Sequence, residues 1–147
     1  MLNFETWLAE GRLRPHKTTK KEIHDLLGIA QRDISDAAVQ GLSSDRRFLI
    51  AYEVALTLAT IPLYSAGFET YGRGHHWLTF RVLPDVMGSE FTELAEFFDI
   101  CRTKRNVGTY DRGGQVSETE VEELLVEVRT FQGIIEDWLR RNHSDLI

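Results

Sequence analysis

The sequence predicts an all-α fold, an up-and-down bundle of four main helices with a short extra helix at the N-terminus. Apolar residues recur at spacings of three and four along most of the chain, which is the period of one face of an α-helix. No segment shows the apolar–polar alternation typical of a half-buried strand. Four long helical segments joined by short loops favour a bundle. The length fits one domain, residues 1–147, with an N-terminal extension (1–18) before the bundle (19–143).

Start and stop signals define the first elements. Residues 2–10 form a predicted short amphipathic helix, and a basic link, residues 12–17, follows it. The sequence Thr19-Lys20-Lys21-Glu22 has the spacing of a capping box, in which the first and last side chains satisfy each other's backbone N–H groups. We therefore expect a long helix from this point to about Gln40, with Gly41 ending it.

An apolar run over residues 48–68 forms most of the second long helix. One residue of the pair Ser43-Ser44 is expected to cap this helix, which ends near Ala66. Pro62 is expected to kink the helix or to mark a break one turn earlier. The run has the length of a membrane span. Polar residues inside it favour instead a helix buried in the bundle, so we expect no membrane association.

Three further helical segments follow. A short helix over roughly 75–87 is expected to be interrupted or bent near Pro84, and Gly88-Ser89 restarts the chain into a long helix that ends near Gly108. The sequence Ser117-Glu118-Thr119-Glu120 is a second capping box and opens the last helix. Acidic residues in its first turns and basic residues in its last turn match the helix dipole.

Composition limits the classes of function. The formal net charge of −6 argues against a protein that coats duplex DNA non-specifically. Two basic clusters remain, one over residues 12–21 and one made by Arg102, Lys104 and Arg105. The first cluster has no interleaved aromatic residues for base stacking, so we interpret it as a solvated linker. The single cysteine, Cys101, lies on an apolar stripe and is expected to pack in the core.

The sequence also indicates a cellular compartment. One cysteine excludes an internal disulfide framework and fits a reducing environment. The N-terminal residues lack a basic segment followed by an apolar segment, so we expect no signal peptide and a cytoplasmic location. The adjacent pair His75-His76 diverges by about 100° on a helix and is a poor metal chelate. We expect neither a metal nor a cofactor.

The stretch from Cys101 to Asp111 is the most informative part of the sequence. Arg105 lies four residues after Cys101 on the apolar stripe, where a hydrophobic residue is expected. A buried arginine keeps its charge and therefore needs a carboxylate or an anionic ligand. Glu53 is the single charged residue between positions 48 and 68. We predict a buried Arg105–Glu53 pair, which either binds an anion or acts as a structural salt bridge.

Four segments, taken in order, resemble the HEPN family (higher eukaryotes and prokaryotes nucleotide-binding domain) over roughly residues 20–140. They are Ile29-Ala30-Gln31-Arg32-Asp33 with Ala37-Ala38, Phe48-Leu49-Ile50-Ala51-Tyr52-Glu53-Val54-Ala55, Gly74-His75-His76, and Arg105-Asn106-Val107-Gly108-Thr109-Tyr110-Asp111. The resemblance implies a small α-helical bundle that forms a homodimer, with the arginine-bearing helices facing a shared cleft.

The resemblance also implies two kinds of activity. Catalytic HEPN proteins are metal-independent endoribonucleases that use an arginine and a histidine four to six positions later. Here Tyr110 stands five positions after Arg105, and the next histidine is His143. A tyrosine, with a pKa near ~10, is a poor general base at neutral pH. Members with similar endings look like non-catalytic binders, often encoded beside small nucleotidyltransferases.

The leading hypothesis is therefore a binding module for a nucleotide or for the phosphates of single-stranded RNA, in a toxin–antitoxin or other defence-type system. Its expected partners are that ligand, a small nucleotidyltransferase and a second copy of the chain. The predicted ligand-binding residues are Arg105, Asn106, Arg102, Tyr110 and Glu53. If the protein is an enzyme, the candidate catalytic residues are Arg105, Tyr110 and Glu53. The alternatives are a metal-independent endoribonuclease and a structural interaction protein without a ligand.

Overall fold

Helices form most of the structure. The computed structural model describes residues 4–110 and 116–147, and it describes the side chains of residues 4–105 and 116–147. Outside the helices, the described regular structure is one pair of three-residue strands. The prediction of an all-α class is confirmed.

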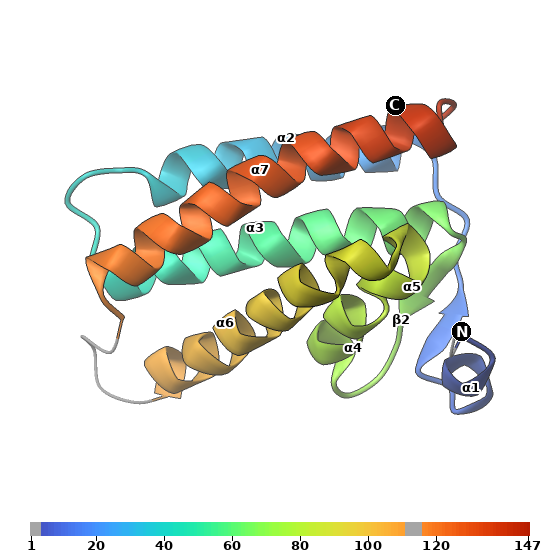
Figure 1. The fold of residues 1–147 in the computed structure, drawn as a ribbon, viewed down its shortest axis with the longest axis horizontal. Helices are drawn as coiled ribbons and strands as arrows, with labels where there is room; N and C mark the ends of the chain where they lie inside the picture. The colour runs from blue at the N-terminus through green and yellow to red at the C-terminus, as the bar shows by residue number, and fades with distance from the viewer. Residues whose placement is uncertain (1–3, 111–115) are drawn as a thin grey trace.

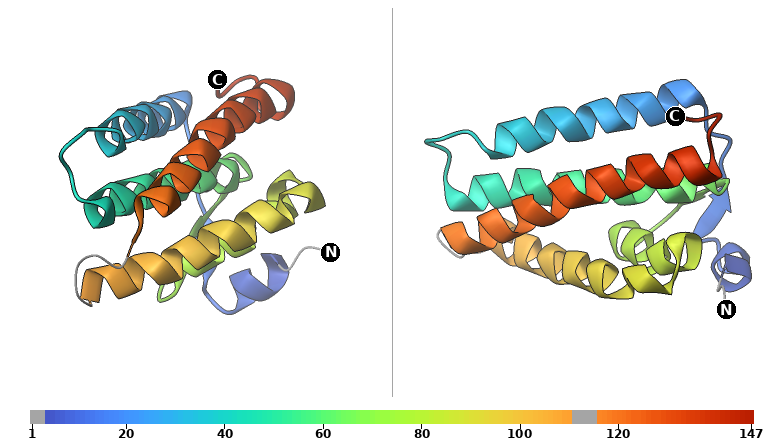
Figure 2. Two further views of the ribbon diagram at one scale, coloured as in Figure 1. Left: turned by 60° about the vertical axis from the view of Figure 1, so that its left-hand side comes forward. Right: turned by 45° about the horizontal axis from the view of Figure 1, so that its top comes forward.

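The long helix α3 (Ser44–Ser65) lies at the centre of the molecule. Helices α2 (Lys20–Ala37) and α7 (Glu118–Asn142) pack against it on one side, and α6 (Thr92–Tyr110) packs against it on the other (Figure 1). The two views in Figure 2 show the same neighbours around α3. A helix with neighbours on several sides must be apolar over most of its surface, which explains why α3 contains so few charged residues.

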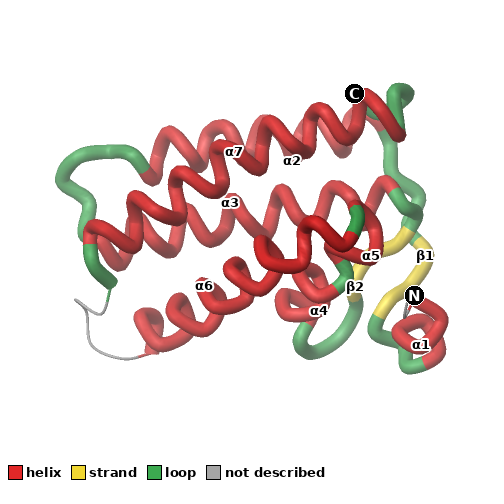
Figure 3. Tube along the Cα trace, in the orientation of Figure 1, coloured by secondary structure: helices red, strands yellow, loops and turns green. Residues whose placement is uncertain are grey.

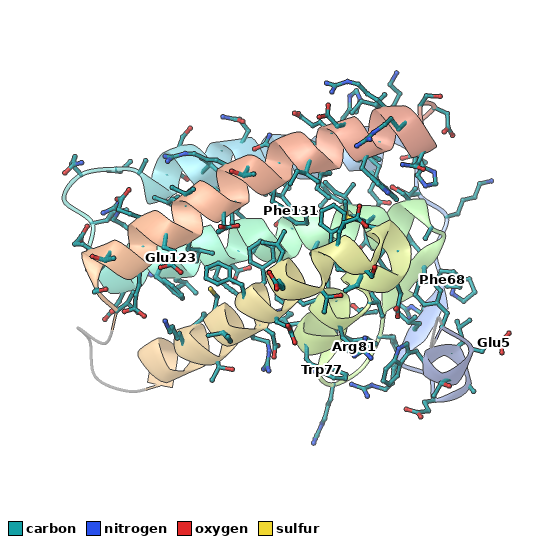
Figure 4. The ribbon with its side chains drawn as sticks, in the orientation of Figure 1. Glu5, Phe68, Trp77, Arg81, Glu123 and Phe131 are labelled. Atoms are coloured by element: carbon teal, nitrogen blue, oxygen red, sulfur yellow. The ribbon has the colours of Figure 1, made fainter. Side chains whose placement is uncertain are left out.

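The core extends from α3 into the surrounding helices. Phe131 on α7, labelled in Figure 4, stacks at a centroid distance of 5.3 Å against Phe98 on α6. Cys101 follows Phe98 on the same face of α6 and is buried, as the stripe predicted. Burial raises the pKa of the Cys101 thiol to about 12, so this cysteine stays protonated and unreactive at neutral pH.

The predicted helix starts are largely confirmed. Thr19 caps α2 by accepting a hydrogen bond from the Glu22 amide at 3.1 Å. The Glu22 carboxylate does not return to Thr19, however, since it accepts from Thr18 and contacts His16 instead. The second capping box, between Ser117 and Glu120, is complete in both directions.

The two prolines of the helical segments differ in their effect. Helix α3 continues through Pro62 to Ser65, so the predicted break one turn before this proline was wrong. Pro84 lies in the first turn of α5 (Leu83–Met87), where a proline fits without losing a bond. The division between α4 (His75–Arg81) and α5 falls just before this proline, which confirms the predicted interruption near Pro84.

Helix α3 also has the length and hydropathy of a membrane span. More than half of the relevant window is buried inside the protein, and the buried helix of a protein core has the same composition. A one-turn 3₁₀ helix, η1 (Ser89–Phe91), leads into α6, which extends through Gly108 to Tyr110 rather than ending near Gly108.

A small antiparallel sheet connects the N-terminal segment to the bundle, and the sequence did not predict it. Strand β1 (Leu13–Pro15) pairs with β2 (Phe68–Thr70), so that Arg14 lies opposite Glu69 (Figure 3). The short helix α1 (Phe4–Ala9) precedes β1. Leu13 is 2% exposed and packs in a second, smaller core cluster with residues from α3 and α4. The basic link is therefore partly a strand with one buried face.

Candidate functional site

Arg105 lies near the C-terminal end of α6 and faces α3. One of its terminal nitrogens, Nη2, is 3.8 Å from Oε1 of Glu53. The side chains are 25% and 42% exposed, respectively. The prediction of a buried pair was wrong in this respect. Glu53 lies between the fully buried residues Tyr52 and Val54, and a step of 100° along the helix turns its carboxylate from the core toward water.

Tyr52 provides an aromatic surface for Arg105. The guanidinium carbon of Arg105 is 5.8 Å from the centroid of the Tyr52 ring, within the range of a cation–π interaction. Burial, reinforced by the negative charge of Glu53, raises the pKa of the Tyr52 phenol above its usual value. Tyr52 therefore keeps its proton and acts as a hydrogen-bond donor.

His76, from the first turn of α4, completes this group. Its Nδ1 is 3.2 Å from the Tyr52 hydroxyl. Because the phenol keeps its proton, the favoured arrangement has the phenol donating to Nδ1, which leaves the ring proton on Nε2. Burial, with further contributions from His75, Arg105 and Arg102, lowers the pKa of His76 to about 4. The imidazole is consequently neutral at pH 7 and presents an Nε2–H donor.

Arg102 is one turn before Arg105 on α6. Its Nε donates to Oδ1 of Asp99 at 2.7 Å, and its side chain is 26% exposed. Both arginines lower the pKa of His76, so their positive charges act on the same imidazole. We call Tyr52, Glu53, His76, Arg102 and Arg105 the Arg–His cluster. Three helices, α3, α4 and α6, supply its members.

A pocket of about 330 Å³ lies beside the cluster, between the start of α3 and the end of α6. Arg105 lines it together with Arg46 and Lys104, so three cationic side chains border one cavity. Two carboxylates offset part of this positive charge. Asp45 also lines the pocket, and Glu120 forms an ion pair with Lys104. The remaining lining residues are Ser43, Phe48, Leu49 and Val116.

The predicted ligand-binding residues thus fall into two groups. Arg105, Arg102 and Glu53 lie together in the cluster. Asn106 and Tyr110 belong to α6, but their side chains lie outside the described residues.

The sequence analysis did not predict that Tyr52 and His76 contact each other beside Arg105. Both residues lie in motifs that it singled out. Their proximity depends on the packing of α4 against α3 and α6, which leaves no local pattern in the sequence.

A different arginine occupies the buried position that was predicted for Arg105. Arg47, in the first turn of α3, is 7% exposed. Its three donor nitrogens reach the carbonyl of Ala37 at 2.7 Å, the carboxylate of Glu118 at 2.7 Å and that of Glu122 at 2.8 Å. These bonds join the ends of three helices. A signal existed in the sequence, because Arg47 lies seven residues before the buried Val54 and shares its face.

Comparisons with known proteins give no further assignment: no family model, curated protein or solved structure matches this chain. Among the described residues, no group of three or more histidine, cysteine, aspartate or glutamate side chains is arranged to hold a metal ion.

Proposed function

We propose that this chain is a HEPN-like module that binds the phosphate of a nucleotide or of RNA at the Arg–His cluster. The observation that carries the proposal is that Arg102 and Arg105 lie close enough to His76 for both charges to act on its imidazole, while Tyr52 contacts both Arg105 and His76. A guanidinium offers donors in a planar fork that matches two phosphate oxygens. A neutral imidazole adds one more donor without adding a third repelling charge.

The position of Arg105 supports a binding role, because its side chain is 25% exposed and lines a pocket. Its Nη2 is 3.8 Å from Oε1 of Glu53, longer than a charge-assisted hydrogen bond of about 2.8 Å, so Glu53 makes a charge contact rather than a tight bidentate pair. The pocket beside Arg105, with its additional cations Arg46 and Lys104, provides room for the rest of a phosphorylated ligand.

The HEPN resemblance extends the proposal to the architecture and the biological setting. Helices α2, α3, α6 and α7, which run in alternating directions in Figure 1, would be the four members of an up-and-down bundle. The protein would act as a cytoplasmic homodimer in a toxin–antitoxin or defence-type system. A small nucleotidyltransferase is the proposed partner within that system.

A thermal-shift titration tests the proposal. Wild-type protein and the variants Arg105→Ala and Arg32→Ala are titrated with ATP, other nucleotides and short single-stranded RNA. Arg32 is a matched control, because it is an exposed arginine paired with Asp33 at 3.0 Å on α2. We expect the ligand to stabilise the wild type and Arg32→Ala, but not Arg105→Ala. Equal stabilisation of all three proteins would contradict the proposal.

His76 favours a second candidate function, metal-independent RNA cleavage. The fold brings this histidine close to Arg105, whereas the sequence motif itself lacks a histidine. In such a reaction the ribose 2′-oxygen attacks phosphorus, the 5′-oxygen leaves, and Arg105 stabilises the charge that develops on the phosphate. The neutral imidazole of His76 would accept the proton of the attacking 2′-hydroxyl at Nε2, in the tautomer whose Nδ1–H faces the Tyr52 hydroxyl, and water would protonate the leaving 5′-oxygen. Gels of the titrated RNA distinguish the candidates, since an enzyme loses cleavage in both Arg105→Ala and His76→Gln.

A result without any ligand effect would favour the structural alternative. In that case the Arg–His cluster is only a contact between α3, α4 and α6, and Arg105→Ala lowers the melting temperature without changing any response to nucleotides.

A further inference from the structure

A second group of arginines and aromatic rings lies around β1, away from the core of the bundle. The guanidinium of Arg12 is between two indoles, 5.0 Å from the ring centroid of Trp7 and 5.1 Å from that of Trp77. Two residues later, the guanidinium of Arg14 stacks 4.2 Å over the ring of Tyr71. Leu13 is buried, so Arg14 lies on the outer face of β1, and the half-buried Arg12 directly precedes the strand.

The rings come from three separate parts of the chain. Trp7 is on α1, Tyr71 follows β2, and Trp77 is on α4, where Figure 4 labels it near the lower edge of the molecule. The sequence cluster over residues 12–21 has no aromatic residue of its own, but the fold supplies three. The interpretation of this segment as a solvated linker was therefore incomplete.

The loop beside these rings borders a pocket of about 570 Å³. Glycines 11, 72 and 74, together with Arg12, Tyr71, Arg73 and Glu10, line it. A Cβ atom added to Gly11 or Gly72 would meet nothing within 4 Å, so a ligand can approach the backbone closely there. A Cβ at Gly74 would lie 3.3 Å from Nη2 of Arg12, which shows that the Arg12 guanidinium forms part of the wall of this pocket.

The charges at this surface are only partly compensated. Arg14 pairs with Glu69 at 3.0 Å. Within the described part of the chain, neither Arg12 nor Arg73 forms an ion pair with a carboxylate. Tyr71 is 53% exposed although its ring also contacts Arg14, so much of the ring remains open to solvent. Uncompensated guanidinium groups and an exposed ring are the two components of a surface that binds single strands.

We propose that this surface, made by Trp7, Arg12, Arg14, Tyr71, Arg73 and Trp77, binds single-stranded nucleic acid. We call it the arginine–aromatic platform. A base stacks on the open face of Tyr71, and Arg12 and Arg73 contact phosphates that flank this base. A duplex would not fit this mode of binding, because its bases are already stacked on one another. These contacts involve only bases and phosphates, so RNA and DNA strands can both make them.

The position of α4 relates the platform to the Arg–His cluster. Gly74 lines the platform pocket, and His76, two residues later, belongs to the cluster. A strand that passes the start of α4 can therefore contact both sites. The proposal for the platform depends only on the residues of the platform. The additional contact of the strand with the Arg–His cluster rests on the proposed function.

Fluorescence anisotropy with a labelled single-stranded oligonucleotide of about 20 nucleotides, as RNA and as DNA, tests the platform. The variants are Tyr71→Ala, Arg73→Ala, Tyr71→Phe and Arg105→Ala, with Arg32→Ala as the control. We expect Tyr71→Ala to weaken binding roughly tenfold, since loss of one base–aromatic stack has about that effect. Tyr71→Phe keeps the ring and should bind like the wild type. Arg73→Ala should weaken binding and make it less dependent on salt.

The pattern of losses separates the two sites. Unchanged affinity in Tyr71→Ala and Arg73→Ala, with binding lost in Arg105→Ala, would overturn the platform and leave the proposed function standing. Weaker binding in Tyr71→Ala and Arg73→Ala, with no effect of Arg105→Ala, would support the platform and contradict the proposed function. No binding of either oligonucleotide by the wild-type protein would overturn the platform. Tyr71 and Arg73 are exposed, and circular dichroism checks that their variants fold.

Discussion

Arg47 and Arg105 are both arginines that face glutamates on a neighbouring helix, and they are held in opposite ways. Arg47 is buried, and its three hydrogen bonds are each 2.7 or 2.8 Å long. Arg105 is a quarter exposed, lies 3.8 Å from Glu53 and lines a pocket. A buried arginine whose three nitrogens each donate to an oxygen of the protein offers little to a ligand. An arginine that is partly exposed and lines a cavity can exchange its contacts for those of an anion.

The difference predicts that Arg47 contributes to stability and Arg105 to binding. The largest expected effect is that of Arg47→Met, which keeps an apolar chain of similar length but removes all three hydrogen bonds. We expect the free energy of unfolding to fall by about 2–3 kcal/mol, since the carbonyl of Ala37 loses its partner while Glu118 and Glu122 remain hydrated. Urea denaturation measures this change.

Arg46→Ala is the matched control for this variant, because Arg46 is the adjacent residue and is exposed. Its effect on the free energy of unfolding should stay within about 0.5 kcal/mol. An equal loss in both variants would mean that the hydrogen bonds of Arg47 do not distinguish it from a surface arginine.

An intermediate effect is expected from His76 as the pH is lowered. Its pKa is about 4 in the folded protein and near ~6.5 in the unfolded chain, so the unfolded state binds more protons between these values. Stability should therefore fall as the pH decreases from about 6.5 to 4, by roughly 1–2 kcal/mol after allowance for solvent screening. His76→Gln should lose this component, which urea denaturation at pH 7 and pH 4.5 measures. An identical pH dependence in both proteins would contradict the assignment to His76.

Apart from the control Arg46→Ala, the smallest change in stability is expected from Arg105→Ala. The Arg105 side chain is a quarter exposed, so solvent screens its charge, and we expect the free energy of unfolding to fall by less than about 1 kcal/mol. The same denaturation experiment provides the comparison with Arg47→Met. A loss of 3 kcal/mol or more would mean that Arg105, like Arg47, is a structural residue. It would contradict the proposed difference between the two arginines.

The parts of the fold that sequence alone could predict are those set by local chemistry. The start of α7 followed from the capping box at Ser117 and Glu120, and the burial of Cys101 followed from the period of its stripe. The strand β1 has only three residues, too few for an alternating pattern to be recognised. Its pairing with β2 depends on residues more than fifty positions away.

The candidate site was only partly predictable for the same reason. The stripe on α6 pointed to Arg105, the isolated charge in the apolar run pointed to Glu53, and the two side chains lie 3.8 Å apart. Which of the two arginines is buried could not be read from one helix, because burial depends on whether another helix covers that end. The first turns of α7 cover Arg47, whereas Arg105 borders a pocket.

The titration of His76 is the most direct test of the Arg–His cluster as an anion site. Nuclear magnetic resonance follows the pKa of its imidazole in the free protein and with saturating ATP. We predict a value near 4 without ligand, because burial and the two arginines oppose protonation, and a clearly higher value with ATP, because phosphate charge offsets the arginines. A value near ~6.5 in the free protein, or no change with ATP, would contradict the account.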